Sequence, residues 1–134
     1  MMRLFTSTDF DACVDLYITT FAGPPWNETW DRQLVCDRLS QIVETPGFFG
    51  AVIEGEPLTG FVLGTSEPWH EGTHFNLKEM CIRPGLQRQG LGTKLLEYLA
   101  LGMPVVANDS PDQVRVLEGS DAGWLVESST EAMA

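Results

Sequence analysis

Helical spacing of apolar residues dominates the first third of the chain. Residues 8–21 predict a helix with Ser7 or Thr8 as N-cap, and Gly23-Pro24-Pro25 ends it. Asn27 can cap a second helix, which ends at Pro46-Gly47. The apolar positions of the first helix are Phe10, Cys13, Val14, Tyr17 and Phe21, and those of the second are Trp30, Leu34, Val35, Leu39, Ile42 and Val43.

The spacing then changes to the alternation that is typical of strands. Residues 48–67 predict a hairpin with its turn at Glu54-Gly55-Glu56-Pro57, and residues 73–84 predict a third strand. The alternation slips in that third strand, because the apolar residues Leu77 and Met80 are three positions apart. We therefore expect a β-bulge there, a feature that often re-aims side chains beside a site.

The last third predicts a β-α-β-α-β order. The stripe of Leu91, Leu95 and Leu99 predicts a helix, which Gly102 ends. Residues 104–109 and 123–127 predict strands, with a helix over 111–117 between them and a fraying tail after them. The whole pattern predicts one α/β or α+β domain over 1–134, built round a single mixed sheet.

Composition narrows the function classes. The 134 residues carry a net charge of −11, which argues against nucleic acid and anionic membranes as partners. No apolar run approaches the ~20 residues of a membrane span, and the N-terminus lacks a signal-peptide core. Cys13, Cys36 and Cys81 have no metal-ligand spacing, so we expect structural thiols, a cytoplasmic location and no metal.

Half of the eight basic residues lie between positions 78 and 94, namely Lys78, Arg83, Arg88 and Lys94. Such a basic island in an acidic protein suits a small polyanion as ligand, although a solvated basic face is the alternative. The acidic exterior as a whole favours a cationic partner, for example a polyamine, an aminoglycoside or a peptide N-terminus.

The loop before the third predicted helix has the features of a phosphate cradle. Gln87, Gly90 and Gly92 follow a strand and precede a helix. Glycines let the backbone approach a ligand closely, and the amides and dipole of a helix start favour negative charge. Arg88 and Lys94 could pair with phosphates. A glycine pair alone also makes plain turns, so the strand and helix around it matter.

With those residues in place, "LKEMCIRPGLQRQGLGTKLLEYL" resembles the acetyl-CoA-binding motif of the GNAT family of N-acetyltransferases. The resemblance covers residues 1–97. It implies a mixed, mostly antiparallel sheet flanked by helices, with acetyl-CoA as co-substrate and a small-molecule or peptide amine as acceptor. The pantetheine arm would lie along the strand where the following strands splay, and the pyrophosphate would rest on the loop. The implied cofactor-binding residues are Met80, Cys81, Ile82, Gln87, Arg88, Gln89, Gly90, Leu91, Gly92 and Thr93.

Glu79 matches the position of a catalytic glutamate in several members, so the resemblance implies that it is the general base. It would act directly or through a water, and the backbone N–H near Cys81 would serve the oxyanion. The alternative is a solvent-facing carboxylate paired with Lys78 or Arg83. Direct transfer is the family's usual route, rather than Cys81 carrying the acyl group. We expect His70 and His74 to be surface or loop residues.

Downstream of Tyr98 the chain lacks the tyrosine that often protonates the thiolate in that family. Instead, residues ~95–134 resemble a C-terminal fragment of GT-B-type glycosyltransferases, which suggests a fusion. Residues 98–134 would still supply the sheet's next strands, with Asn108 near the pantetheine. The last strand of the usual fold would be missing, and a homodimer could cover that edge. Two alternatives to an active enzyme follow: a catalytically weak acetyl-CoA-binding module, or a fused fragment without function. The matching residues are Glu97, Ala100, Gly102, Pro104, Val105, Val106, Ala107, Gly123, Leu125 and Val126.

Overall fold

A mixed sheet forms the centre of the molecule. The computed structural model describes residues 1–70, 72–87, 89–100, 105–108 and 124–127, with side chains as far as Leu99. Within these residues the strand order is β1-β2-β3-β4-β5-β6, antiparallel from β1 to β4 and parallel from β4 to β6. The predicted mixed, mostly antiparallel sheet is confirmed. Its strands are β1 (Met2–Leu4), β2 (Phe48–Ile53), β3 (Gly60–Trp69), β4 (Gly72–Ile82), β5 (Val105–Asn108) and β6 (Trp124–Glu127).

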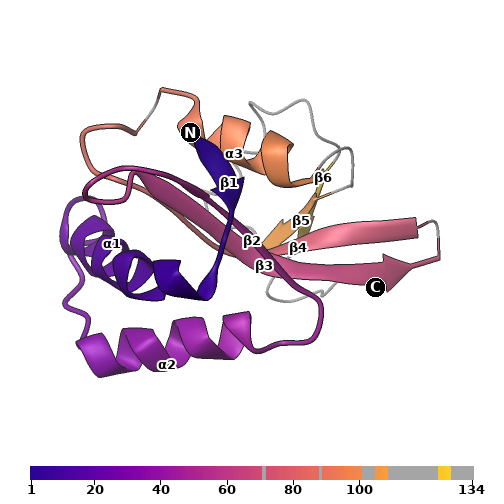
Figure 1. The fold of residues 1–134 in the computed structure, drawn as a ribbon, viewed down its shortest axis with the longest axis horizontal. Coiled ribbons are helices and arrows are strands. Elements are labelled where there is room, and N and C mark those ends of the chain that lie inside the picture. Colours follow the sequence, from indigo (N-terminus) through magenta and orange to yellow (C-terminus); the bar gives the residue numbers. More distant parts are fainter. Residues whose placement is uncertain (71, 88, 101–104, 109–123, 128–134) are drawn as a thin grey trace.

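Helices cover both faces of this sheet (Figure 1). Helices α1 (Phe10–Ala22) and α2 (Arg32–Val43) lie on one face, and α3 (Leu91–Ala100) lies on the other. A short 3-10 turn, η1 (Ser7–Asp9), leads into α1. Each face has its own apolar core. The first contains Cys13, Val14, Leu16, Tyr17, Val35, Leu39, Val52, Leu58, Phe61, Leu63 and Cys81. The second contains Ala51, Ile53, Val62, Phe75, Leu77, Leu95, Leu96 and Leu99.

The start of α2 differs from the prediction. Asp31, not Asn27, caps the helix, because its carboxylate accepts a hydrogen bond of 3.3 Å from the Leu34 amide. Asn27 has a φ of 52° and donates its N–H to the Gly23 carbonyl, so it belongs to the turn that ends α1. Trp30 consequently precedes the helix. Leu34 is 54% exposed, so its place on the predicted apolar face was wrong.

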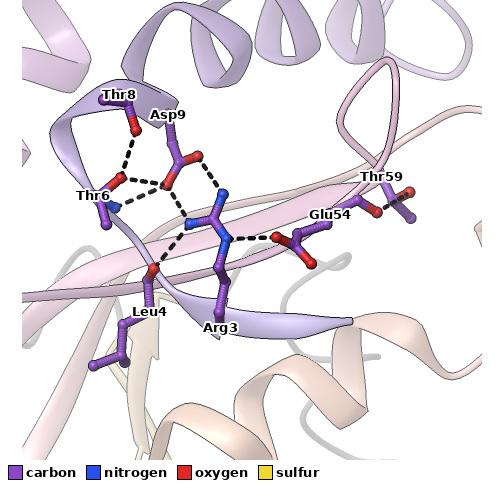
Figure 2. Close-up of polar contacts among 7 residues, drawn as sticks. All are labelled: Arg3, Leu4, Thr6, Thr8, Asp9, Glu54 and Thr59. Carbon is purple, nitrogen blue, oxygen red and sulfur yellow. Dashed lines mark hydrogen bonds and ion pairs between the residues drawn. The ribbon is translucent and has the colours of Figure 1, made fainter.

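Strand β1 was not predicted. Met2–Leu4 pairs with Ala51–Ile53, and three residues are too few to show a period. Arg3 fixes this strand to its neighbours, as Figure 2 shows. Its guanidinium donates two hydrogen bonds of 2.8 Å to Asp9 at the start of α1 and one of 2.8 Å to Glu54 after β2.

The predicted bulge lies in β4, at Lys78. Leu63 pairs with Glu79 while Gly64 pairs with Leu77, so Lys78 has no partner in the ladder. Gly64 permits the close approach at this point, because a Cβ atom there would lie 2.2 Å from the Asn76 carbonyl oxygen. Any larger residue at position 64 would force the two strands apart.

The bulge changes which side chains of β4 face each core. Before Lys78, Phe75 and Leu77 pack on the α3 face, and after it the residues on that face are Met80 and Ile82. Cys81 packs in the core beneath α1 and α2. Because side chains alternate along a strand, Glu79 faces α1 and α2 as well.

Strands β4 and β5 stay paired only briefly. Phe75 pairs with Val105 and Asn76 with Val106, and there the described pairing ends. From Leu77 to Ile82, β4 has no partner strand on this side within the described residues. The predicted splay of the strands therefore begins directly before the bulge.

The predicted strands 104–109 and 123–127 correspond to β5 and β6. The predicted helix over 111–117, the terminator Gly102 and the tail lie outside the described residues, as does any last strand of the sheet. None of the helices in the described part of the chain combines the length and apolar character that crossing a membrane would require.

Candidate active site

Glu79 is buried and ion-paired. Only 6% of the Glu79 residue is exposed to solvent. Arg38 of α2 donates hydrogen bonds of 3.2 Å from Nε and 3.1 Å from Nη2 to the Oε2 atom of Glu79. Arg38 follows Val35 by three positions, so it lies at the border of the buried face of α2 and reaches the sheet from there. The alternative in which Glu79 faces solvent and pairs with Lys78 or Arg83 was wrong.

Burial determines the protonation of Glu79. Burial raises the pKa of the carboxyl group. The charge and hydrogen bonds of Arg38 and a hydrogen bond from the Met80 amide lower the pKa, but they do not outweigh burial. Glu79 therefore has a pKa above the ordinary value of a glutamate, which is the direction that a general base near neutral pH requires.

Tyr17 of α1 belongs to the same cluster. It is 3% exposed, and burial together with the charge of Glu79 raises the pKa of its hydroxyl, so it keeps its proton. Burial lowers the pKa of Arg38, but Glu79 and Tyr17 outweigh burial and the net shift is upward. Glu79 thus shares a buried cluster with a permanent cation and a neutral phenol. Sequence reasoning placed Tyr17 in the apolar face of its helix and missed Arg38, since their meeting depends on tertiary packing.

A shallow, open groove lies beside this cluster. It has a volume of about 260 Å³, and α2, the residues just after it and the bulge of β4 form its walls. Its lining residues are Arg38, Gln41, Ile42, Thr45 and Lys78.

The loop after β4 is held from both ends. The Gln87 side chain donates a 3.0 Å hydrogen bond to the Ile82 carbonyl, and the Leu86 amide donates to the Arg83 carbonyl at 3.0 Å. Gln87 therefore shapes the loop in this structure. The Arg83 guanidinium contacts the carbonyls of Pro57 and Leu58, which ties the loop to the β2–β3 connection.

The end of this loop fits an anionic group. Gly90 has a φ of 76°, a conformation that favours glycine, and no described atom lies within 4 Å of where its Cβ would be. The ladder of α3 begins with the Lys94 amide donating to the Gly90 carbonyl at 3.0 Å, so the amides of Leu91 and Gly92 precede it. An open glycine before a helix start is the arrangement that phosphates bind.

The predicted basic island does not converge on this loop. Lys78 lines the groove on the α1 and α2 face, whereas Arg83 contacts carbonyls. Lys94 is exposed in the first turn of α3. Arg88 lies outside the described residues, and so does the side chain of Asn108, the last residue of β5.

The remaining cofactor-binding candidates lie along one path. Met80 and Ile82 are partly buried on the α3 face of β4, and Cys81 is buried on the opposite face. Gln89, Leu91, Gly92 and Thr93 continue from the loop into α3. Burial raises the pKa of the Cys81 thiol well above its usual range, so the thiol stays protonated and poorly nucleophilic.

His74 was expected at the surface, and this was wrong. It is 6% exposed, its Nε2 atom lies 3.3 Å from Glu67 Oε1, and its ring lies against Trp69. Glu67 faces the same side of the β3–β4 hairpin and accepts a second hydrogen bond from Asn76. In the part of the chain that the structure describes, no group of three or more metal-ligating side chains comes together.

Comparison with known families decides the assignment. The model of the Acetyltransferase (GNAT) family matches residues 10–100, which is more than half of the chain and includes Glu79, the splayed strand and the loop. The chain belongs to the GNAT acetyltransferase family. It is therefore an acyltransferase by class, and acetyl-CoA is the co-substrate of that family. A comparison with curated proteins finds no match.

Solved structures of other proteins share the fold at low identity. A ribosomal-protein-alanine N-acetyltransferase from Brucella melitensis biovar Abortus 2308 has a TM-score of 0.67 at 14% identity, with 92% of each chain covered. An aminoglycoside N-acetyltransferase in complex with CoA has a TM-score of 0.62 at 12% identity, covering 94% of this chain and 90% of its own. An integron cassette protein from the mobile metagenome of Cole Harbour Salt Marsh has a TM-score of 0.66 at 17% identity, covering 99% of this chain and 90% of its own.

Proposed function

We propose that this GNAT protein transfers the acetyl group of acetyl-CoA to a primary amine, with Glu79 as the general base. The bulge at Lys78 carries the proposal. It directs a buried carboxylate with a raised pKa toward α1 and α2 at the point where β4 and β5 part. Acetyl-CoA supplies an activated acetyl thioester, and the amine must lose a proton to attack it.

The residues of β4 and the loop would hold the co-substrate. No described strand pairs with the β5 side of β4 at Met80, Cys81 and Ile82, so this backbone edge can pair with an extended, amide-containing chain. The residues from Gln87 to Thr93, with their open glycine and helix start, suit the pyrophosphate. Asn108 at the end of β5 would complete the cleft. The backbone N–H near Cys81 would stabilise the developing oxyanion.

Glu79 would accept the ammonium proton directly or through a water. Arg38 occupies only the Oε2 atom with its two hydrogen bonds, and it fixes the carboxylate in one orientation. A base whose pKa lies above that of an ordinary glutamate binds the proton more readily once it is transferred.

Calorimetry tests the first step of this function. We expect saturable binding of acetyl-CoA to the purified chain and none of UDP-glucose. Glu79→Gln should keep acetyl-CoA binding and lower the rate of thiol release with amines by 10²-fold or more. Binding of UDP-glucose instead, or an unchanged rate for Glu79→Gln, would contradict the proposal.

The ion pair of Glu79 favours a second candidate, an acetyl-CoA-binding module with weak catalysis. A carboxylate that is fixed by Arg38 can serve to attach α2 to β4 rather than to move protons. Such a module would bind acetyl-CoA with the same dependence on Gly90 but would release no thiol in the presence of amines.

The C-terminal segment raises further proposals. We infer a single domain over 1–134. Within it, residues 98–134 would take the place of the family's own C-terminal strands, and they would descend from a GT-B-type glycosyltransferase fragment. A homodimer through the sheet edge after β6 is the associated prediction, and light scattering of the chain at high concentration tests it. The free cysteines support a cytoplasmic location.

A further inference from the structure

The groove beside Glu79 is cationic, although the protein carries a net charge of −11. Among the described residues that line it, Arg38 and Lys78 bear positive charge, and none bears negative charge. Lys78 is exposed and forms no ion pair with any described residue. The charge of Arg38 is partly balanced by Glu79, so Lys78 supplies most of the uncompensated charge of the groove.

The groove also adjoins the proposed reacting centre. Lys78 is the bulged residue and directly precedes Glu79, and Arg38 contacts the Glu79 carboxylate. A molecule in the groove would therefore meet Lys78 and Arg38 together. Gln41 and Thr45 are polar residues of the wall, and the Thr45 hydroxyl donates a 2.6 Å hydrogen bond to the Gln41 carbonyl.

We propose that this groove binds the carboxylate of the acceptor, and that the acceptor is a small amine which also carries a carboxylate, as an amino acid does. The inference rests on the proposed acetyl transfer and extends it to the substrate class. The carboxylate pairs with Lys78 and the exposed side of Arg38, while the amine faces Glu79. A bidentate or charge-assisted contact of this kind is stronger than a neutral hydrogen bond.

The local charge opposes the cationic acceptors that the acidic composition favours. A polyamine would bring further positive charge next to Lys78 and Arg38, which costs binding energy at short range. The net charge of the chain acts over a long distance and is screened by salt, whereas the groove acts in contact with the ligand. The lining residues therefore decide which amine is accepted.

A matched panel of acceptors tests the inference by thiol release. It comprises the proteinogenic amino acids, their carboxamides and spermidine, compared at equal concentrations of unprotonated amine because amidation lowers the amine pKa. We expect the preferred amino acid to have a KM about tenfold or more below that of its carboxamide. Lys78→Gln should raise that KM about tenfold, with little change in kcat and none in the KM of the carboxamide.

Arg32→Gln is the matched control. Arg32 is an exposed cation of α2, the helix that also carries Arg38. It pairs with Asp15 and lies outside the groove, so its removal should leave every KM unchanged. Lys78→Glu should reverse the preference toward the carboxamide and spermidine. The inference is overturned if spermidine or the carboxamides react faster than the amino acids with the unmodified protein, or if Lys78→Gln leaves the KM for the amino acid unchanged. Either result leaves acetyl transfer intact.

Calorimetry with the preferred amino acid in the presence of CoA separates the two proposals, because it needs no turnover. Binding that Lys78→Gln weakens about tenfold supports the carboxylate site even if thiol release is absent, in which case only the transfer proposal falls. If no amino acid binds or releases thiol, the inference is overturned, and the proposed transfer falls with it only if spermidine and the carboxamides release no thiol either.

Discussion

Arg38 of α2 donates two hydrogen bonds, of 3.2 and 3.1 Å, to a single oxygen of Glu79 in β4, 41 positions along the chain. The carboxylate is buried, whereas the arginine side chain is 47% exposed. The buried Glu79 carboxylate therefore needs a countercharge in order to ionise. The half-exposed Arg38 stays charged with or without Glu79. This asymmetry determines what happens when either partner is changed.

Replacing Arg38 by Gln should raise the pKa of Glu79 further, because Arg38 lowers it in the native protein. We expect the acid limb of the pH–rate profile to move to higher pH, so that the rate falls at neutral pH and recovers in alkaline buffer. Arg32→Gln should leave the profile in place. An acid limb that does not move would exclude Glu79 as the titrating base.

The same substitution should also change stability with pH. A carboxyl group whose pKa is raised by folding stabilises the native state most below its unfolded pKa, and this contribution is lost as pH rises through the folded pKa. Arg38→Gln should therefore cost about 1 kcal/mol at pH 8 and less at pH 5. Urea denaturation at the two pH values measures this, and adding Glu79→Gln to the variant should remove the difference.

Gly90→Val should weaken acetyl-CoA binding by tenfold or more. The φ of 76° strains any L side chain by about 1–2 kcal/mol, and valine would fill the open space before α3. Gly72→Val is the control, since Gly72 has a φ of 127° and equally open surroundings at the hairpin tip. Both variants should melt earlier, but only Gly90→Val should lose affinity in calorimetry. Equal affinity in the two variants would remove the loop from the binding site.

Gly64→Ala should destabilise the fold by about 3 kcal/mol, because the added Cβ would lie 2.2 Å from the Asn76 carbonyl oxygen and 2.6 Å from the Phe75 ring. Gly23→Ala is the control, with its nearest atom at 3.9 Å and a φ of −90°. It should change stability by less than about 0.5 kcal/mol. Chemical denaturation compares the two, and similar losses would show that the strands do not approach closely at the bulge.

Asp9→Asn should weaken the start of α1 by about 1 kcal/mol, since Asp9 accepts a 2.8 Å hydrogen bond from the Thr6 amide. Hydrogen bonds from Arg3 hold the pKa of Asp9 below its ordinary value of 3.8. Its contribution is therefore present above that value and is lost as pH falls through the lower folded pKa. Acid unfolding of Asp9→Asn should start from a lower stability and fall less steeply than in the native protein.

Asp11→Asn serves as the comparison for that acid unfolding, because Asp11 is an exposed carboxylate in the first turn of α1. Its acid unfolding should follow that of the native protein. Matching curves for Asp9→Asn and Asp11→Asn would mean that the contacts in Figure 2 contribute nothing specific to stability.

Local sequence patterns predicted most of the helices and strands, but not the tertiary contacts between them. Helix α1, the hairpin, the bulge and the glycine loop each follow from spacing or from residue type within a short segment. Asn27 and Asp31 are both good caps in one loop, and only the turn that ends α1 excludes Asn27. Strand β1 depends on its pairing with β2, which three residues cannot reveal.

The candidate site was predictable only on β4 and the loop. Glu79 and Gly90 could be named from a motif, because motifs record residues that are close in sequence. Arg38 and Tyr17 could not, since their positions beside Glu79 depend on how α1 and α2 pack on the sheet. The cationic groove was missed for the same reason, and the net charge of the chain pointed to the opposite kind of ligand.

Strand β4 has two phases of alternation, and Lys78 separates them. If β4 kept Lys78 but lost the bulge, strict alternation would exchange the faces of every residue from Glu79 to Ile82. Glu79 and Cys81 would then point into the apolar core beneath α3, and Met80 would take the place beside Arg38. A deletion of Lys78 itself would keep these residues on their present faces, because Leu77 and Glu79 already lie on opposite faces of the sheet. Substitutions in this strand alter one side chain at a time, whereas loss of the bulge would alter the whole site together.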